Sequence, residues 1–148
     1  MRIAVIGTEA ANERELETAR AVGEAIGRRG HDLVCGGRGG VMAAAAEGAR
    51  SAGAATVGIL PGPDLSEANP HLEVAIATNL GSMRNELVVR NGEGVVAVGG
   101  RYGTLSEIAL ALDLGRPVAG LATHDVDGVM HVEGATAALD AIEAAVGQ

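Results

Sequence analysis

The 148-residue sequence contains no lysine, tryptophan or phenylalanine, and it has only one cysteine and one tyrosine. The single cysteine, Cys35, excludes an internal disulfide. Because aromatic residues make up only 1% of the chain, the core has to be built from Val, Ile, Leu, Ala and Met, with neighbouring backbones close together. No run approaches the roughly 20 apolar residues of a membrane-spanning helix, and the apolar run after Met1 is too short for a signal peptide. We therefore expect a cytoplasmic protein that contacts no membrane.

The charge balance is acidic: 19 Asp and Glu against 11 basic residues, all of them arginine, give a formal net charge of −8. A chain of this charge repels the phosphate backbones of DNA and RNA at long range, so we expect no nucleic-acid partner. With 47% apolar and 20% charged residues, the sequence can form a core, which excludes general disorder. The length fits one domain, which we expect to span residues 1–148.

Short runs rich in β-branched residues alternate with longer stretches of helical periodicity. This alternation, with strands that are apolar almost throughout, predicts a Rossmann-like doubly wound α/β fold. Its mainly parallel sheet is expected to have six or seven strands, with helices on both faces. Strands are expected at 2–6, 31–35, 56–60, 72–77, 94–98 and 117–121, with a short edge strand at 129–132, and helices at 12–29, 41–52, 82–91, 104–114 and 135–146.

Glycine-rich segments follow three of the expected strands, at Gly7-Thr8, 36–40 and 99–103. In doubly wound sheets, ligands bind beyond the carboxyl ends of the strands. Glycine lets backbone N–H groups approach a ligand, and a helix start offers unpaired N–H groups, so a phosphate can bind without lysine. Alternatively, these glycines only allow the chain to make tight turns. Both longer segments also carry an arginine, however, and this favours an anionic ligand. The residues expected to bind it are Gly7, Thr8, Gly36, Gly37, Arg38, Gly39, Gly40, Met42, Gly99, Gly100, Arg101, Tyr102, Gly103 and Thr104.

Arg84 and Glu107 are candidates for a buried charge pair. Arg84 lies near the start of an expected helix, where a cation is unfavourable, so it calls for an anion or a carboxylate partner. If neighbouring strands carry the two helices, Arg84 and Glu107 can meet above the sheet edge. Thr104 and Glu107 also have the spacing of a capping box, in which the carboxylate only satisfies a backbone N–H group. The spacing alone leaves both interpretations open.

Three segments, Cys35–Met42 (CGGRGGVM), Arg84-Asn85 and Gly99–Ala111 (GGRYGTLSEIALA), resemble the LOG (Lonely Guy) family, once taken for lysine decarboxylases. The resemblance covers roughly residues 2–121 and is greatest to the branch that contains the molybdenum-cofactor carrier proteins. It implies a Rossmann-like fold and assembly as homodimers or homotetramers. It also implies a phosphate-bearing small-molecule ligand, either a nucleotide or a molybdopterin-type cofactor. We expect no required cofactor and no metal site. Lysine decarboxylation is not implied.

In the phosphoribohydrolases of the family, the residues that match Arg84 and Glu107 take part in hydrolysis of the N-glycosidic bond of nucleoside 5′-monophosphates. This chain departs from their pattern, since Asn85 replaces a lysine and Gly99 and Arg101 replace the proline and second glycine of the loop. We therefore predict binding of a nucleotide-type ligand, most concretely a molybdenum-cofactor carrier or storage protein. A phosphoribohydrolase is the alternative, and an oligomeric nucleotide sensor is the second alternative. Whether the protein is an enzyme stays open at this point.

The remaining signals are weaker. His124, Asp125, Asp127 and His131 form a cluster whose spacing matches no standard zinc site, so we expect a solvated loop without metal. We expect Cys35 to be a buried, small apolar residue. Tyr102, inside the ligand loop, could equally stack on a planar ring of the ligand or serve packing.

Overall fold

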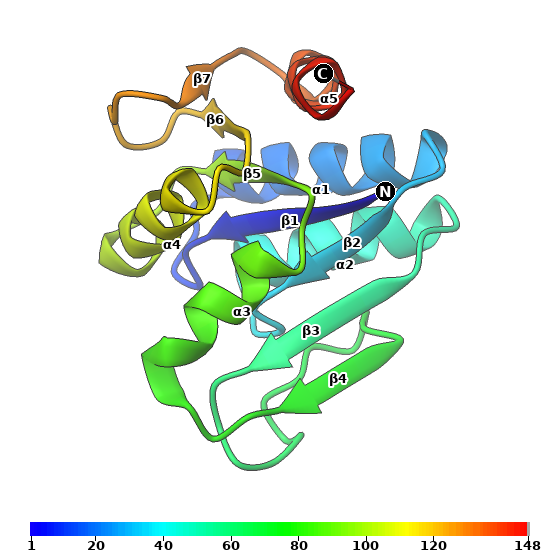
Figure 1. The fold of residues 1–148 in the computed structure, drawn as a ribbon. Coiled ribbons are helices and arrows are strands. Elements are labelled where there is room, and N and C mark those ends of the chain that lie inside the picture. Colours follow the sequence, from blue (N-terminus) through cyan, green and yellow to red (C-terminus); the bar gives the residue numbers. More distant parts are fainter. Residues whose placement is uncertain (148) are drawn as a thin grey trace.

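The computed structural model of the protein describes residues 1–147. Within them, the central sheet has seven strands in the order β4-β3-β2-β1-β5-β6-β7, and every neighbouring pair is parallel (Figure 1). The strand order reverses between β1 and β5, which are hydrogen-bonded neighbours. The predicted doubly wound α/β fold is therefore confirmed. The strands are β1 (Arg2–Gly7), β2 (Asp32–Cys35), β3 (Thr56–Leu60), β4 (Val74–Ala77), β5 (Gly94–Val98), β6 (Val118–Leu121) and β7 (Met130–His131).

Helices cover both faces of the sheet, and the core is divided accordingly into two clusters (Figure 1). One face packs against α1 (Glu13–Arg28), α2 (Val41–Ser51) and α5 (Ala135–Val146), and the other against α3 (Arg84–Arg90) and α4 (Tyr102–Asp113). The helix expected at 82–91 is divided into a 3₁₀ turn, η1 (Gly81–Met83), and the shorter α3. Helix α4 begins two residues before the expected start, which changes the role of Glu107, as shown below.

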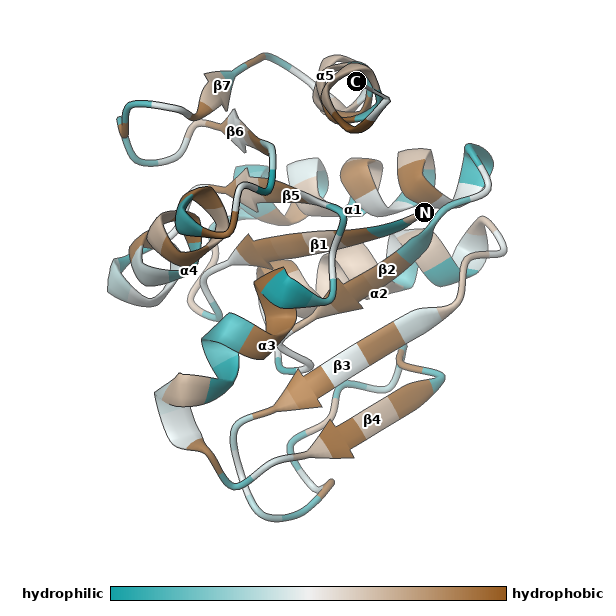
Figure 2. Cartoon of the chain, viewed as in Figure 1, coloured by the Kyte–Doolittle hydropathy of each residue, from teal (hydrophilic) through white to brown (hydrophobic). Residues whose placement is uncertain are grey.

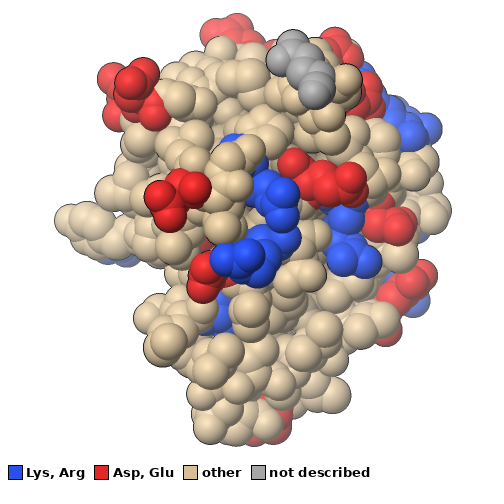
Figure 3. All heavy atoms as spheres, viewed as in Figure 1, with Lys and Arg blue, Asp and Glu red and all other residues tan. Residues whose placement is uncertain are grey.

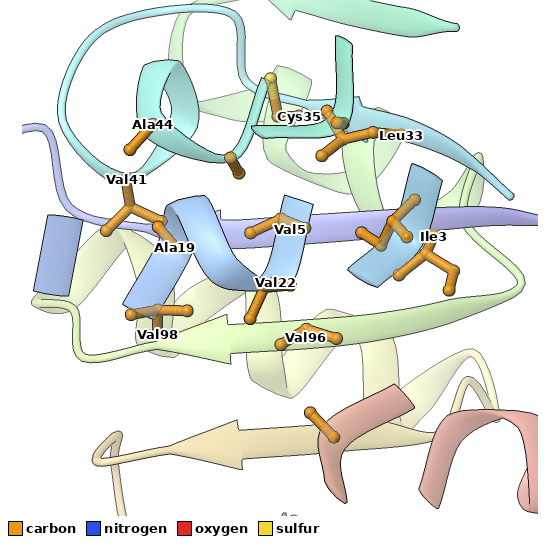
Figure 4. Packing of buried hydrophobic residues seen from close by; sticks show 14 of the residues in the cluster. Ile3, Val5, Ala19, Val22, Leu33, Cys35, Val41, Ala44, Val96 and Val98 are labelled. Carbon is orange, nitrogen blue, oxygen red and sulfur yellow. The ribbon is translucent and has the colours of Figure 1, made fainter. Parts of the chain in front are cut away.

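The contact between α1 and α2 accounts for part of the glycine and alanine content of the chain. A Cβ atom on Gly23 of α1 would lie 2.0 Å from the carbonyl oxygen of Ala45 in α2, and one on Gly48 would lie 2.1 Å from that of Arg20. The two helix backbones therefore touch, and larger side chains cannot enter the contact. Figure 4 shows Ala19 and Val41 among the small side chains that fill the space between these helices and the strands.

The sheet is apolar through its centre and becomes exposed at its β4 edge. Figure 2 shows hydrophobic residues along β1, β3 and β5, and Val74 and Ile76 of β4 are 49% and 45% exposed. The surface over β3 and β4 carries few charged side chains in the view of Figure 3. Across residues 1–147, no helix combines the length and apolar character that crossing a membrane requires.

Candidate functional site

A cavity of about 430 Å³ lies at the carboxyl edge of the sheet, where the strand order reverses. We call it the switch-point cavity. Its walls come from the end of β1, the β2–α2 loop, the η1–α3 segment and the start of α4. This is the place where doubly wound sheets bind ligands. The lining residues are Gly7, Thr8, Glu9, Arg38, Met42, Pro61, Gly81, Ser82, Arg84, Asn85, Arg101, Gly103, Thr104 and Glu107.

A larger cavity of about 790 Å³ lies at the same edge, between the starts of α1 and α5. Its polar lining residues, which include Arg14, Glu15, His131 and Glu133, are all half-buried or exposed. The switch-point cavity, in contrast, contains buried charged side chains. Since buried charges without a structural partner mark functional sites, the smaller cavity is the better candidate.

Two helices begin at the switch-point cavity with backbone N–H groups that have no partner among the described residues, those of Met42 in α2 and of Gly103 and Thr104 in α4. The first N–H group of α2, that of Val41, donates to the carbonyl oxygen of Thr8 at 3.1 Å. The N-cap residue of α2 is Gly40 and that of α4 is Arg101, and neither helix has a side-chain cap or an acidic first turn within the described chain. Helix α1 differs: Asn12 and Glu15 form a capping box that satisfies its first N–H groups. The starts of α2 and α4 therefore keep both unpaired donors and a partial positive charge, the features that bind phosphate groups.

Arginine side chains add positive charge to this edge of an acidic molecule. The Nη2 atom of Arg38 lies 3.2 Å from Oε2 of Glu9, and its Nε atom lies 3.6 Å from Oε2 of Glu67. These exposed carboxylates orient the Arg38 side chain. Arg101 forms no ion pair with any residue from 1 to 147, so its charge is free for a ligand.

Arg84 and Glu107 lie buried in the same cavity, with 8% and 6% of their surface exposed. Nη1 of Arg84 donates a hydrogen bond of 2.7 Å to Oδ1 of Asn85, whose Nδ2 donates to Oγ of Ser106 at 3.2 Å. A Cβ atom on Gly36 would lie 2.9 Å from Nη1 and Nη2 of Arg84, so glycine at this position makes room for the guanidinium group. The predicted pair does meet in one cavity, but not because neighbouring strands carry the two helices: β4 and β5, which precede α3 and α4, are separated by β3, β2 and β1 in the sheet. The pair meets because α3 and α4 pack against each other on the same face of the sheet.

Burial changes the acid–base behaviour of both side chains. Loss of solvation raises the pKa of Glu107 to about 8, although the charge of Arg84 opposes this rise. Burial also lowers the pKa of Arg84, against the opposing effect of Glu107. Glu107 makes no hydrogen bond or ion pair with any described residue, and no described group is a partner for Nε of Arg84. The pair therefore keeps hydrogen-bonding capacity for a ligand.

The capping-box interpretation of Glu107 is wrong. Helix α4 begins at Tyr102, with Arg101 as its N-cap residue, so Thr104 lies inside the helix and cannot cap it. Glu107 is consequently one turn further along and lines the cavity instead of closing a helix end.

Nine predicted residues line the cavity, and seven do not. Those in the lining are Gly7, Thr8, Arg38, Met42, Arg84, Arg101, Gly103, Thr104 and Glu107. Those outside it are Gly36, Gly37, Gly39, Gly40, Gly99, Gly100 and Tyr102. Gly40 has a φ of 63°, and a Cβ atom added to it would lie 2.4 Å from the carbonyl oxygens of Thr8 and Glu9. Glycine is therefore needed here because the β2–α2 loop passes close to the backbone that follows β1. Gly100, with a φ of 105°, is packed against a side chain instead: its Cβ would lie 2.4 Å from Cβ and Oγ1 of Thr104.

Tyr102 and Cys35 have different surroundings. The Tyr102 side chain is 82% exposed outside the cavity lining, and its stacking on a ligand stays a prediction. Cys35 is fully buried at the end of β2, where burial raises the pKa of its thiol to about 12. The thiol therefore stays protonated, as expected for a small core residue.

Five lining residues were not predicted from the sequence. These are Glu9, Pro61, Gly81, Ser82 and Asn85. Asn85 follows Arg84 in the same motif and could have been included on that ground. Glu9 and Pro61 follow β1 and β3 and carry no local signal, because only the packing of the sheet brings them to the cavity.

The histidine-rich segment between β6 and β7 forms no metal site. No group of three metal-ligating side chains occurs in the described part of the chain, and His131 only approaches Asp125, at 3.9 Å. The segment supports the glycine loop instead. Oγ1 of Thr123 donates to the carbonyl oxygen of Gly99 at 2.5 Å, and Nε2 of His124 lies 2.8 Å from that of Arg101.

Comparison with known proteins assigns the chain to a family. It matches the model of the SLOG cluster4 family over residues 1–146. An uncharacterized protein of Archaeoglobus fulgidus is 46% identical over 122 residues, which cover 82% of this chain and 80% of the relative.

Two solved structures are similar to this chain over nearly its whole length. The molybdenum cofactor binding protein of Rippkaea orientalis is 33% identical with a TM-score of 0.91, and the match covers 97% of this chain and 95% of that one. The molybdenum cofactor carrier protein of Chlamydomonas reinhardtii is 32% identical with a TM-score of 0.89, covering 99% and 98%. The resemblance read from the three sequence motifs is thereby confirmed, and the chain belongs to the SLOG cluster4 family.

Proposed function

We propose that this protein binds a phosphate-bearing pterin cofactor of the molybdenum-cofactor type in the switch-point cavity and serves as its carrier or store. The observation that carries the proposal is the convergence of two uncapped helix starts and the arginines Arg38 and Arg101 on one cavity. An acidic protein that places its free N–H groups and cationic side chains at one edge is suited to a small anion. The similarity to molybdenum-cofactor binding and carrier proteins supports the same ligand.

The residues of the cavity fit the organic part of such a cofactor. The starts of α2 and α4 would hold the phosphate, while Arg84 and Glu107 offer polar partners to the ring. The described residues contain no cluster of His, Cys, Asp and Glu suited to a metal, and the Cys35 thiol stays protonated. In this proposal, molybdenum is therefore cargo held through its pterin ligand.

A purification experiment tests the proposal. The protein is produced in a host that makes molybdenum cofactor, and the pterin released on denaturation is measured by fluorescence and by native mass spectrometry. We expect a pterin in the wild type and at least tenfold less in a variant with both Arg38→Ala and Arg101→Ala. The matched control is Arg28→Ala, which removes an exposed arginine at the end of α1. Equal pterin content in all three proteins, or none in the wild type, contradicts the proposal.

A phosphoribohydrolase is the second candidate, and one observation favours it: Arg84 and Glu107 lie in the same cavity as the helix starts. A carboxylate next to a sugar can stabilise the positive charge that develops as an N-glycosidic bond breaks. Incubation with nucleoside 5′-monophosphates distinguishes the two functions. Sustained release of base and ribose 5-phosphate that Glu107→Gln abolishes would establish the hydrolase and overturn the carrier.

A further inference from the structure

The buried side chains that line the switch-point cavity, which we call its floor, are unusually polar. Four of the six buried polar or charged side chains in the described chain line it, namely Arg84, Asn85, Thr104 and Glu107. Asn85 is engaged on both sides, since its Oδ1 accepts from Arg84 and its Nδ2 donates to Ser106. Glu107, by contrast, has no partner among residues 1–147, and Arg84 uses only Nη1. Of the two buried side-chain nitrogen atoms without a partner in the described chain, Nε of Arg84 belongs to this cavity, and the unpaired carboxylate of Glu107 lines the same cavity.

Leaving the Glu107 carboxylate and part of the Arg84 guanidinium group without hydrogen-bond partners is unfavourable. A ligand with complementary donors and acceptors would supply these partners. A buried polar group without a partner costs about 1–3 kcal/mol, and more if it is charged. The charge of Arg84 relieves Glu107 only in part, since it lowers the pKa of the carboxyl but the two side chains form no ion pair within the described chain. Without a ligand, burial keeps Glu107 mostly protonated near neutral pH, but two N–H donors from a ligand favour the ionised form. The ionised carboxylate offers two neighbouring acceptors, and the guanidinium group of Arg84 in the same cavity offers a donor. Together they present the pattern acceptor, acceptor, donor.

We infer that Glu107 and Arg84 receive the edge of a 2-amino-4-oxopyrimidine ring, the edge that guanine and pterin share. This edge presents the amino group, the adjacent ring N–H and the carbonyl oxygen, which form the complementary pattern donor, donor, acceptor. The two N–H groups bind the carboxylate in parallel, and the carbonyl oxygen accepts from Arg84. The inference rests on the proposed function, because the phosphate has to be held at the helix starts of the same cavity.

Other rings match this floor less well. A hypoxanthine edge lacks the amino group and leaves one carboxylate oxygen without a donor. A xanthine edge places a carbonyl oxygen against the carboxylate, where two acceptors repel each other. An adenine edge presents one donor and one acceptor. The cavity volume of about 430 Å³ lies within the range of roughly 300–1,000 Å³ of small-molecule sites.

Ligand pairs that differ only at this edge test the inference by calorimetric titration. Guanosine, inosine and xanthosine 5′-monophosphates share sugar and phosphate, and 6-hydroxymethylpterin and 6-hydroxymethyllumazine provide the pterin arm. Loss of one hydrogen bond to a charged group predicts that the 2-amino ligand binds about 10- to 100-fold more tightly than its partner. A preference in the nucleotide arm identifies guanine as the source of the edge, and one in the pterin arm identifies pterin.

Substitution at position 107 separates recognition from a structural role. Glu107→Gln replaces one acceptor by a donor, so the preferred nucleotide should change from guanosine to xanthosine monophosphate. Glu17→Gln, an exposed position on α1, should leave the order unchanged. Absence of any 2-amino preference in both arms overturns the inference. Binding of inorganic pyrophosphate then distinguishes the two hypotheses. If pyrophosphate binds to the wild type but not to the variant with Arg38→Ala and Arg101→Ala, the proposed function holds and only the inference about the ring edge fails. If pyrophosphate does not bind to the wild type either, the proposed function and the inference both fail.

Discussion

Replacing Glu107 by glutamine should make the protein less sensitive to alkaline pH. The Glu107 side chain is 6% exposed, and burial raises its pKa to about 8 from the ordinary 4.5. Between these two pH values the folded state binds a proton that the unfolded state has released. Stability therefore falls as pH rises through this window and levels off above pH 8. Glutamine has nearly the shape of the protonated acid and does not titrate.

The size of the effect follows from the pKa values. Each pH unit inside the window changes the free energy of unfolding by about 1.4 kcal/mol, so the wild type loses at most about 5 kcal/mol between pH 4.5 and pH 8 relative to Glu107→Gln. Below pH 4.5 the two proteins should be about equally stable, since both then carry a neutral side chain at this position.

Urea unfolding of both proteins at pH 5, 6, 7, 8 and 9 measures the difference directly. Taking the difference between the two proteins removes the contribution of all other titrating groups. Glu17→Gln, on an exposed position of α1, serves as the matched control and should follow the wild type at every pH. A constant difference between wild type and Glu107→Gln from pH 5 to pH 9 would show that Glu107 is not protonated in the folded protein near neutrality.

Three further substitutions test the packing of α1 on α2, the backbone strain at Ala122 and the cap of α1. Gly23→Ala places a Cβ atom 2.0 Å from a backbone carbonyl oxygen of α2 and should lower the free energy of unfolding, measured with urea, by about 1–3 kcal/mol. The control is Gly103→Ala, whose Cβ atom meets open space in α4 and should not lower this free energy. Equal losses in the two variants would contradict the close contact between α1 and α2. Ala122 has a φ of 49°, so Ala122→Gly should raise the unfolding free energy by about 1 kcal/mol, and a lower melting temperature would argue against strain there. Asn12→Ala removes the α1 cap and should cost about 1 kcal/mol, a loss that thermal unfolding would detect.

The fold was largely predictable because the central strands are unambiguous in sequence. The runs at β1 and β5 are apolar almost throughout, which is typical of parallel strands buried on both faces. The limits of the edge elements were less predictable. Strand β4 is half exposed, and the segment expected as one helix at 82–91 begins as a 3₁₀ turn, so periodicity gave no sharp boundary there.

The site was predictable where a residue sits directly on a strand-to-helix turn. Arg38, Arg101 and Thr104 line the cavity as expected, because each follows a strand whose end faces it. Seven predicted residues lie outside the lining, and glycines such as Gly40 serve crossings of the backbone that no local pattern distinguishes from a ligand contact. The start of α4 decided the role of Glu107, and sequence placed it two residues too late.

Two expectations stay predictions: assembly as a homo-oligomer, which the family resemblance implies, and the cytoplasmic location, which was inferred from the sequence. Light scattering in solution measures whether the protein is a homodimer or homotetramer. The compartment in which it occurs is measured by fractionation of the source cells.

A titration with inorganic pyrophosphate, followed by NMR of the ¹⁵N-labelled protein, measures anion binding at the switch-point cavity directly. The amide resonances of Met42, Gly103 and Thr104, at the starts of α2 and α4, should shift together and reach saturation. The amides of Glu13 and Arg14 should not move, because they belong to the capped start of α1. Shifts confined to α1, shifts spread evenly over the surface arginines, or no saturable shift would contradict an anion site at this cavity.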